Sequence, residues 1–328
     1  MSKIVVIVEG GIGKNVAFTA VLRCLSKSLN QKISVVTGWP LVYHGNPYIE
    51  DVWQFGYTDH FYKTYFEDNT DTKLFKVEPY IHSDYIYKKR HIIDIWCELL
   101  GVEYDNELPE LFLFQRELEV AKDFMEKQEK PTLIAQFWGG PMVEPDQFEE
   151  TLSKWQRRYI PHKIAQKIVD GLKDDYNIML IAGKDQQFIK GVTPLVDQLR
   201  VVMAAIKYAD KLLLIDSFAQ HVAAAFNKQA TVLWGGTYPG CLGYSIHKNI
   251  MSDLCPDPHC HRPNSHLFDT LAGGILWSCP YDNVCTQYDP DEVIKILLRE
   301  EEKKTEKKKK EDEEDKEDEE LKDSPLIL

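Results

Sequence analysis

With 328 residues, of which 44% are hydrophobic, the chain is long enough for two medium-sized globular domains, each with its own core. Its net charge of −13 excludes a broad basic surface for duplex nucleic acid, and no apolar run reaches the roughly 18 residues of a transmembrane helix. Seven unevenly spaced cysteines do not suit a disulfide scaffold, so we expect a cytoplasmic protein. Contact with a membrane surface stays open.

The chain begins with an apolar run, a glycine turn and a helical pattern. Ile4–Val8 predicts a buried strand, residues 10–13 form the turn, and Lys14–Leu29 predicts a helix, whose free N–H groups favour anions. A nucleotide-triphosphatase loop needs Ser or Thr after the lysine to hold Mg²⁺, but Asn15 follows it. A dinucleotide-binding turn needs glycine where Val16 stands. Both nucleotide motifs are therefore incomplete.

Strands and helices alternate along the rest of the chain, which is typical of doubly wound α/β units. The further predicted strands are Ile33–Thr37, Thr132–Phe137, Ile178–Ala182, Leu212–Ile215 and Thr231–Trp234. The further predicted helices are Arg90–Leu100, Phe114–Gln128, His162–Lys173, Gln198–Tyr208 and Phe218–Phe226.

The pattern starts a second time after the polar stretch Glu126–Pro131. We therefore predict two Rossmann-like domains, residues 1–128 and 129–298, that face each other across a ligand cleft. Residues 299–328 contain 9 Lys or Arg and 14 Asp or Glu, and we expect them to form a disordered, solubilising tail.

Two consecutive predicted strands end in residues suited to a ligand with phosphates and a ribose. Asp216 ends one strand, and Ser217 can cap the next helix. The following strand ends in a glycine turn at 235–237. His221, one turn into the helix, fits a ligand contact and a buried core histidine equally well.

These residues resemble the C-terminal signature of glycosyltransferase family 9, the ADP-heptose heptosyltransferases. The family's D-[ST]-G-x-x-H and G-x-T-x-P motifs correspond to DSFAQH at 216–221 and GGTYP at 235–239. Upstream, the glycine turn with AVLRCL and the segment GNPYIEDV at 45–52 also resemble family elements. The match is collinear from residue 4 to about residue 298.

The resemblance implies a GT-B architecture and metal-independent transfer of a sugar from a nucleotide-diphosphate sugar, ADP-heptose-like, to a hydroxyl of a glycan or other acceptor. The C-terminal domain would hold the donor, with Arg158 at the family's phosphate-binding lysine and Gln187 near its ribose-binding acid. The expected donor-binding residues are Gly10, Gly13, Trp138, Gly139, Arg158, Gly183, Gln187, Asp216, Ser217, Phe218, Ala219, His221, Gly235 and Thr237.

The chain departs from the family at two positions. Lys14 stands where the family has its proposed catalytic aspartate, which leaves Glu9 as the nearest carboxylate, so Glu9 and Lys14 are the catalytic candidates. Phe218 replaces a glycine of the donor site. A nucleotide-sugar-binding protein without turnover therefore stays open as an alternative, and the sequence GGIGK at 10–14 leaves a P-loop-like NTPase as a third.

Two further features remain outside these motifs. Cysteines 255, 260, 279 and 285 could hold a structural zinc ion, although free or paired cysteines fit their loose spacing as well; no other cofactor is expected. The aromatic-rich stretch Phe55–Tyr87 could form an acceptor surface, and ordinary packing is the alternative.

Overall fold

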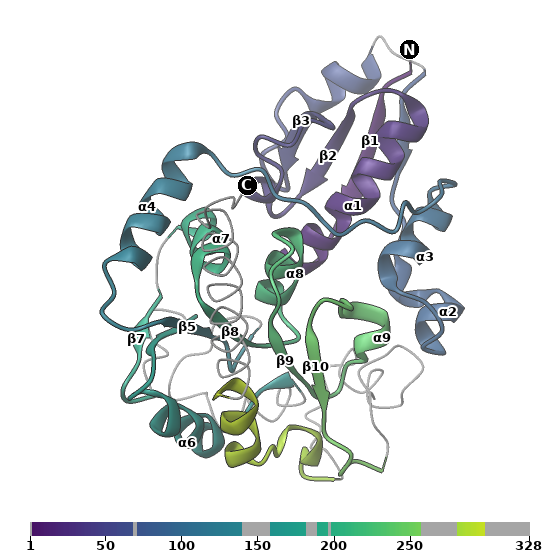
Figure 1. Cartoon of the computed structure of the whole chain (residues 1–328). Helices are drawn as coiled ribbons and strands as arrows, with labels where there is room; N and C mark the ends of the chain where they lie inside the picture. Colours follow the sequence, from purple (N-terminus) through teal and green to yellow (C-terminus); the bar gives the residue numbers. More distant parts are fainter. Residues whose placement is uncertain are drawn as a thin grey trace, which may run out of the picture.

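The computed structural model describes residues 2–67, 71–139, 158–181, 189–195, 198–256 and 281–298, and it contains two parallel sheets (Figure 1). The first has the order β3-β2-β1-β4, formed by β1 (Ile4–Val8), β2 (Ile33–Thr37), β3 (Ile49–Gln54) and β4 (Lys73–Phe75). The second has the order β10-β9-β8-β5-β6-β7, formed by β5 (Thr132–Ala135), β6 (Asn177–Leu180), β7 (Thr193–Pro194), β8 (Lys211–Ile215), β9 (Thr231–Trp234) and β10 (Lys248–Met251). The predicted α/β class is confirmed.

Helices connect and cover these strands. The α-helices are α1 (Ile12–Leu29), α2 (Ser83–Ile86), α3 (Ile92–Leu99), α4 (Gln115–Glu126), α6 (His162–Leu172), α7 (Leu199–Tyr208), α8 (Phe218–Ala225) and α9 (Pro239–Leu242), and residues 290–298 are also helical. Shorter helical turns are η1 (Pro40–Val42), the π-helical η2 (Lys63–Glu67), η3 (Pro79–Ile81) and η6 (Val284–Thr286).

All predicted strands are present, and the strands that the sequence pattern missed lie at or near sheet edges. β3 contains three half-buried and three exposed residues, and β10 has exposed ends, so neither shows the continuous apolar run of a central strand. By contrast, every residue of β2 and β8 is buried. Central parallel strands can therefore be predicted from their apolar runs, whereas partly exposed strands cannot.

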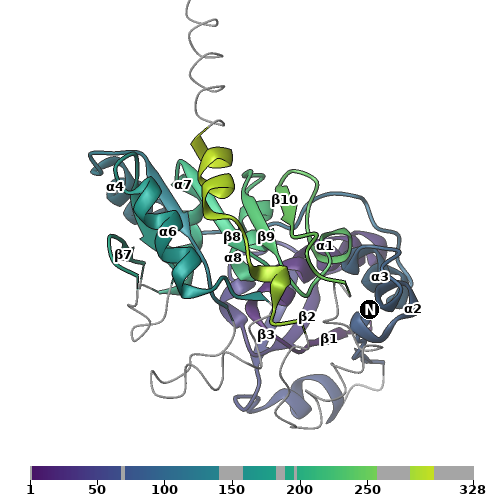
Figure 2. The same cartoon turned by 90° about the horizontal axis from the view of Figure 1, so that it is seen from below.

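The two sheets are joined by helix packing. α1 of the first sheet packs on α8 of the second, and α4 packs on α7; α4 and α7 lie on the same side of the molecule in both views (Figures 1 and 2). The predicted boundary at residue 128 assigns α4 to the N-terminal domain, although its contacts are with the C-terminal half. The boundary itself stays a prediction.

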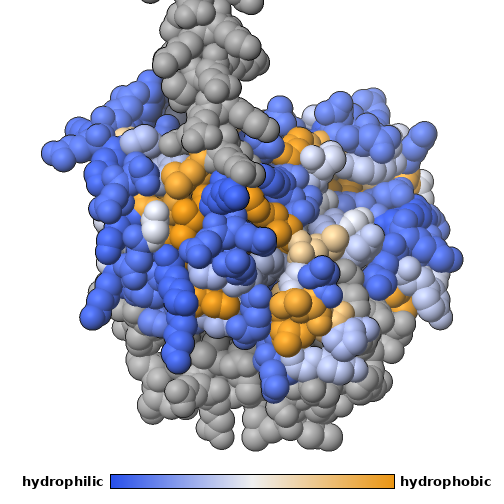
Figure 3. All heavy atoms as spheres, turned by 60° about the horizontal axis from the view of Figure 1, so that its bottom comes forward, coloured by the Kyte–Doolittle hydropathy of each residue, from blue (hydrophilic) through white to orange (hydrophobic). Residues whose placement is uncertain are grey.

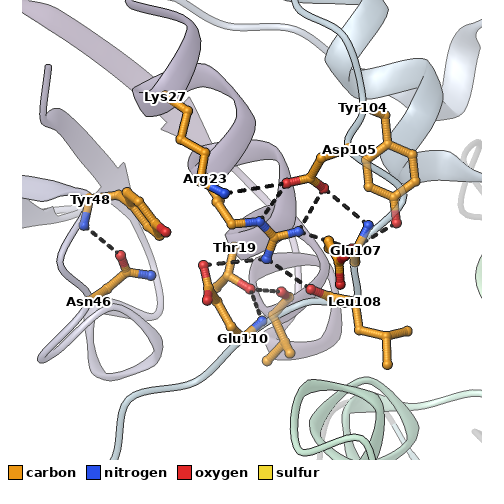
Figure 4. Close-up of polar contacts among 11 residues, drawn as sticks. Thr19, Arg23, Lys27, Asn46, Tyr48, Tyr104, Asp105, Glu107, Leu108 and Glu110 are labelled. Carbon is orange, nitrogen blue, oxygen red and sulfur yellow. Dashed lines mark hydrogen bonds and ion pairs between the residues drawn. The ribbon is translucent and has the colours of Figure 1, made fainter. Parts of the chain in front are cut away.

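The extended segment between α3 and α4 is fixed to α1 by a buried arginine (Figure 4). Arg23, 5% exposed, donates from Nε and Nη2 to the carboxylate of Asp105, at 2.8 and 2.9 Å, and from Nη1 to the carbonyl of Leu108 at 2.9 Å. Thr19 Oγ1 accepts from the backbone N–H of Glu110 at 3.0 Å. The segment that connects the two halves is therefore held against α1.

The outer surface is largely polar where it can be seen. Figure 3 shows hydrophilic side chains over most of the coloured face, with hydrophobic residues in separate groups. Within the described ranges, the structure contains no helix that combines the length and the hydrophobicity needed to cross a bilayer.

Candidate functional site

Two helices from different halves begin beside each other. A Cβ added to Gly13 in the first turn of α1 would lie 2.8 Å from His221 Cδ2 and 3.2 Å from Phe218 Cα, so only glycine permits this approach. Neither helix has a side-chain cap at its N-terminus. Uncapped N–H groups and the partial positive charge of two helix ends therefore meet at one place.

The expected cap from Ser217 is not formed. Its Oγ instead accepts a hydrogen bond at 3.1 Å from Nε2 of Gln136, the residue that follows β5. Gln136 is only 3% exposed, and its Oε1 has no hydrogen-bond partner among the described residues. A buried acceptor without a partner is uncommon in proteins, and it suggests a group that a ligand satisfies.

Arg158 and Asp216 lie beside the start of α8. Arg158 Nη1 is 3.3 Å from the backbone carbonyl oxygen of Asp216 and 3.7 Å from its carboxylate. The Asp216 side chain is 6% exposed, and Arg158 Nε is buried with no partner in the part of the chain that the structure describes. The guanidinium therefore has an unused donor next to two helix N-termini, an arrangement that suits phosphate oxygens.

Two tyrosines of the first half approach this group. Burial raises the pKa of Tyr80, and the negative charge of Asp216 raises it further. Burial also raises the pKa of Tyr85, followed by its interactions with Tyr80 and Asp216. Both phenols are therefore neutral at physiological pH and keep their protons for hydrogen bonding. Side chains from the first half thus lie within electrostatic reach of Asp216 in the second.

The glycine loop before α1 is held by side chains. Asn15, fully buried, donates from Nδ2 to the carbonyl of Gly11 at 3.0 Å and accepts at Oδ1 from the hydroxyls of Thr37 (2.6 Å) and Tyr43 (2.9 Å). Gly10 has a φ of +100°, which favours glycine. Asn15, at the position where a triphosphatase loop has Ser or Thr, therefore holds the loop from inside.

The two catalytic candidates differ in their surroundings. Lys14 Nζ lies 2.6 Å from the carboxylate of Glu78 and over the rings of Tyr80 (4.9 Å) and Trp96 (5.3 Å), and its side chain is 8% exposed. Glu9 is half exposed and pairs with Lys76 at 2.8 Å. Lys14 is thus a fixed, partly enclosed cation, whereas Glu9 is a carboxylate open to solvent.

His221 has the contacts of a buried core histidine. Its Nδ1 lies 2.8 Å from Tyr244 Oη and its Nε2 lies 3.0 Å from Gln220 Nε2. Because Gln220 Nε2 is an amide donor that also bonds the Leu242 carbonyl, we assign the imidazole proton to Nδ1. Burial lowers the pKa of His221 to about 3, with smaller contributions from nearby histidines. The imidazole is therefore neutral, with both nitrogens engaged.

Most of the remaining residues expected to bind the donor substrate lie within the described part of the chain. Gly139 lies against Ser217, since an added Cβ would be 2.8 Å from its hydroxyl oxygen, and Trp138 donates from its indole to the Ile160 carbonyl at 3.0 Å. Ala219, Gly235 and Thr237 are buried, and Phe218 packs against the core. Gly183 and Gln187 lie outside the described residues.

Sequence reasoning missed Gln136 and Tyr80. Gln136 interrupts the apolar run LIAQF at 133–137, which is the signal that could have identified it. Tyr80 gives no such signal, because its place beside Asp216 depends on how the two halves pack.

The fold matches solved glycosyltransferases. A family 9 glycosyltransferase from Veillonella parvula superposes with a TM-score of 0.64 at 14% identity, over 91% of this chain and 96% of that one. ADP-heptose LPS heptosyltransferase II from Escherichia coli gives 0.57 at 15% identity, over 91% and 99%. The heptosyltransferase TibC from enterotoxigenic E. coli, in complex with ADP-D-β-D-heptose, gives 0.61 at 13% identity, over 91% and 78%.

No protein-family model matches the chain, and no curated protein sequence does either. The similarity is therefore one of three-dimensional structure, and it agrees with the motifs at 216–221 and 235–239 that first indicated it. The chain has the GT-B fold of the glycosyltransferases of family 9.

Proposed function

We propose that this protein is a glycosyltransferase that moves a sugar from a nucleotide-diphosphate sugar to a hydroxyl acceptor. One observation carries the proposal: the uncapped starts of α1 and α8 meet beside Arg158, whose Nε has no partner in the described ranges. A leaving diphosphate needs such fixed donors and positive charge when it accumulates charge in the transition state. In the proposed reaction these residues, and not a metal ion, stabilise the leaving diphosphate.

The acceptor hydroxyl must lose a proton as the new glycosidic bond forms. Glu9 is the candidate base, because it is an exposed carboxylate at the end of β1, next to the glycine loop. Lys14, an ammonium paired with Glu78, has no lone pair to accept a proton. Its role in the proposal is electrostatic: it adds positive charge to the first turn of α1.

The donor proposed is ADP-heptose-like. The support is the fold shared with two heptosyltransferases, one of which was solved with ADP-D-β-D-heptose, together with the motif at 216–221. Adenine recognition is the part of this proposal that a comparison of ADP with UDP tests directly.

Calorimetric titration of the full chain with ADP and UDP, with and without Mg²⁺, tests the donor site. We expect ADP binding that is independent of Mg²⁺, that weakens by about tenfold or more in Asp216→Asn, and that is unchanged in Asp170→Ala, an exposed acid on α6. Thermal denaturation of each variant identifies loss of folding. Failure of both nucleotides to bind to folded wild-type protein would contradict the proposal.

A nucleotide-sugar-binding protein without turnover is the second candidate, and the lysine at position 14 favours it. Incubation with a donor panel separates the two, since an active site slowly hydrolyses its donor and releases free sugar. A third candidate, the P-loop-like NTPase, requires ATP hydrolysis that is lost in Lys14→Ala.

A structural metal bound by the distal cysteines is a separate proposal. Ser252 Oγ donates to the Val284 carbonyl at 3.3 Å, so the segments that carry Cys255 and Cys285 run close together. Cys260 and Cys279 lie outside the described residues, and the described ones contain no cluster of three or more potential ligands. TibC is described as iron-containing. Elemental analysis of purified protein for zinc and iron, repeated on Cys255→Ser, tests the proposal.

A further inference from the structure

Four strand ends place four kinds of group in a row along the carboxyl edge of the first sheet. The order β3-β2-β1-β4 puts Phe55, just after β3, next to Trp39, just after β2; the Glu9-Gly10 pair follows β1, and Lys76 follows β4. Glu9 and Lys76 are in contact at 2.8 Å, which confirms that the row continues to its far end. Ligands of parallel α/β sheets bind outside this edge.

The aromatic part of this row is exposed. Phe55 is 42% exposed, Trp39 is 36% exposed and Tyr57, in the turn after β3, is 76% exposed. Together these three residues form what we call the aromatic patch. Phe18 and Trp96 of the same half are, by contrast, at most 1% exposed, although Tyr62 and Tyr87 are exposed as well. Three exposed aromatic side chains at the carboxyl edge of the sheet therefore form a candidate ligand-binding surface.

The patch is held in place by polar bonds. Trp39 donates from its indole Nε1 to the carbonyl of Gly10 at 3.0 Å and from its backbone N–H to Thr37 Oγ1 at 3.1 Å. The backbone N–H of Phe55 donates to the carbonyl of Thr37 at 3.0 Å. Thr37 thus fixes both aromatic residues, and the indole is tied directly to the glycine loop. An aromatic face that is already ordered loses little entropy when a ligand stacks on it.

The composition of the row favours a carbohydrate over a purely apolar partner. A pyranose has one face of C–H groups, which packs on aromatic rings, and a rim of hydroxyls, which need polar partners. Here aromatic rings stand next to a carboxylate, an ammonium group and a glycine turn. An uncharged bilayer surface or a hydrophobic peptide has no hydroxyl groups with which to bond the Glu9–Lys76 pair.

We infer that the aromatic patch binds the carbohydrate acceptor, with the sugar stacked on Trp39 and Phe55 and a hydroxyl directed toward Glu9. This inference rests on the proposed glycosyltransferase function, and it specifies the acceptor as a glycan with an exposed C–H face. The glycine loop lies between the patch and the start of α8, since Gly10 bonds Trp39 and Gly13 touches Phe218. The acceptor and donor sites are therefore adjacent.

A printed array of oligosaccharides, probed with the full chain, tests the inference. We expect binding to a subset of glycans that falls by about tenfold in Trp39→Ala and in Phe55→Ala. Phe124→Ala is the matched control, because Phe124 is 43% exposed but belongs to α4, which packs on α7 of the second half. Glycan binding by this variant should equal that of the wild type. Calorimetric ADP binding should be the same in all four proteins.

Three outcomes would overturn the inference. One is the absence of glycan binding by wild-type protein that binds ADP, and another is glycan binding that Trp39→Ala and Phe55→Ala leave unchanged. The third is sedimentation with phosphatidylglycerol vesicles that is lost in Trp39→Ala, since it would assign the patch to a lipid surface. Absence of ADP binding to the wild type would instead contradict the proposed function, so the two failures are distinguishable.

Discussion

Gly13 lies at a close contact between the two halves. Its added Cβ would meet the His221 ring at 2.8 Å and the Phe218 backbone at 3.2 Å, and a backbone neighbour cannot rotate away. Gly11, two residues earlier, has no atom within 4 Å of the same position. The two glycines of one loop therefore have different reasons to lack a side chain.

We expect Gly13→Ala to lower the free energy of unfolding by about 2 kcal/mol, because α8 must shift to admit the methyl group. Nucleotide binding at the start of α8 should weaken in the same variant. Gly11→Ala should change stability by less than about 1 kcal/mol, the cost of replacing glycine at an N-cap. Urea denaturation of both variants measures the difference, and equal losses would contradict the close approach.

The Lys14–Glu78 pair is the second residue-scale feature. Its ammonium is largely enclosed, while the Glu78 side chain is 39% exposed. Lys14→Asp would place a carboxylate opposite a carboxylate, and we expect a loss of about 2 kcal/mol, below the usual cost of breaking a fully buried pair because Glu78 can be solvated. The charge reversal Lys14→Asp with Glu78→Lys should recover part of this stability. A double-mutant cycle by urea denaturation measures the coupling, which would be near zero if the pair contributed nothing.

At the scale of elements, a single arginine of α7 holds three segments of the other half together. Arg200 is 4% exposed and donates to both carboxylate oxygens of Glu117, at 2.7 and 2.9 Å. It also donates to the carbonyl oxygens of Leu41 (2.7 Å) and Phe112 (2.8 Å). The guanidinium thus links α7 to η1, to the segment before α4 and to α4 itself.

Lysine cannot reproduce this set of bonds, because an ammonium group lacks the planar fork of a guanidinium. We expect Arg200→Lys to cost about 3 kcal/mol, since it leaves buried carbonyl oxygens without donors. It should also speed proteolytic cleavage of the segment between α3 and α4. Arg116→Lys, on the exposed side of α4, is the matched control and should behave as wild type. Unchanged stability in Arg200→Lys would mean that the packing of α4 on α7 suffices without these bonds.

The elements differ in how well the sequence predicted them, and the physical reason is burial on both faces. β2 and β8 are buried throughout and read as apolar runs, so they were predicted, whereas β3 was not because half its residues face solvent. The candidate site was indicated by the motif resemblance at 216–221, and its residue roles stay predictions. Arg200 and Gln136 could not be assigned roles, because their partners lie far away in the sequence.

At the scale of the whole molecule, a group of three histidines surrounds Tyr244 where the halves meet. His91 caps α3 in the first half, and its ring centre lies 5.4 Å from that of Tyr244. His221 and His247 of the second half lie at 5.6 and 5.8 Å. Burial lowers the pKa of His91 to about 4 and that of His221 to about 3, and it also lowers the pKa of His247. Native packing here therefore requires neutral imidazoles.

The consequence is a loss of stability in mild acid. In the unfolded chain these histidines bind protons near pH 6.5, whereas in the folded protein the pKa of His91 is about 4, that of His221 is about 3 and that of His247 is also lowered. Below pH 6.5 the unfolded state thus binds more protons, and stability falls by up to about 1.4 kcal/mol per pH unit for each histidine. Asp105 remains ionised in this range, since its hydrogen bond with Arg23 lowers its pKa to about 2.

We therefore expect the free energy of unfolding to decrease steadily from pH 7 to pH 5, in urea denaturation at constant ionic strength. His91→Asn should reduce this slope, because asparagine can replace the Nδ1 acceptor that caps the N–H of Ile93 but does not titrate. His60→Asn, at an exposed residue in the turn before η2, should keep the wild-type slope. Because His91 belongs to the first half and Tyr244 to the second, the acid sensitivity is expected to be a property of their packing together. A flat profile in the wild type, or equal slopes in both variants, would contradict this assignment.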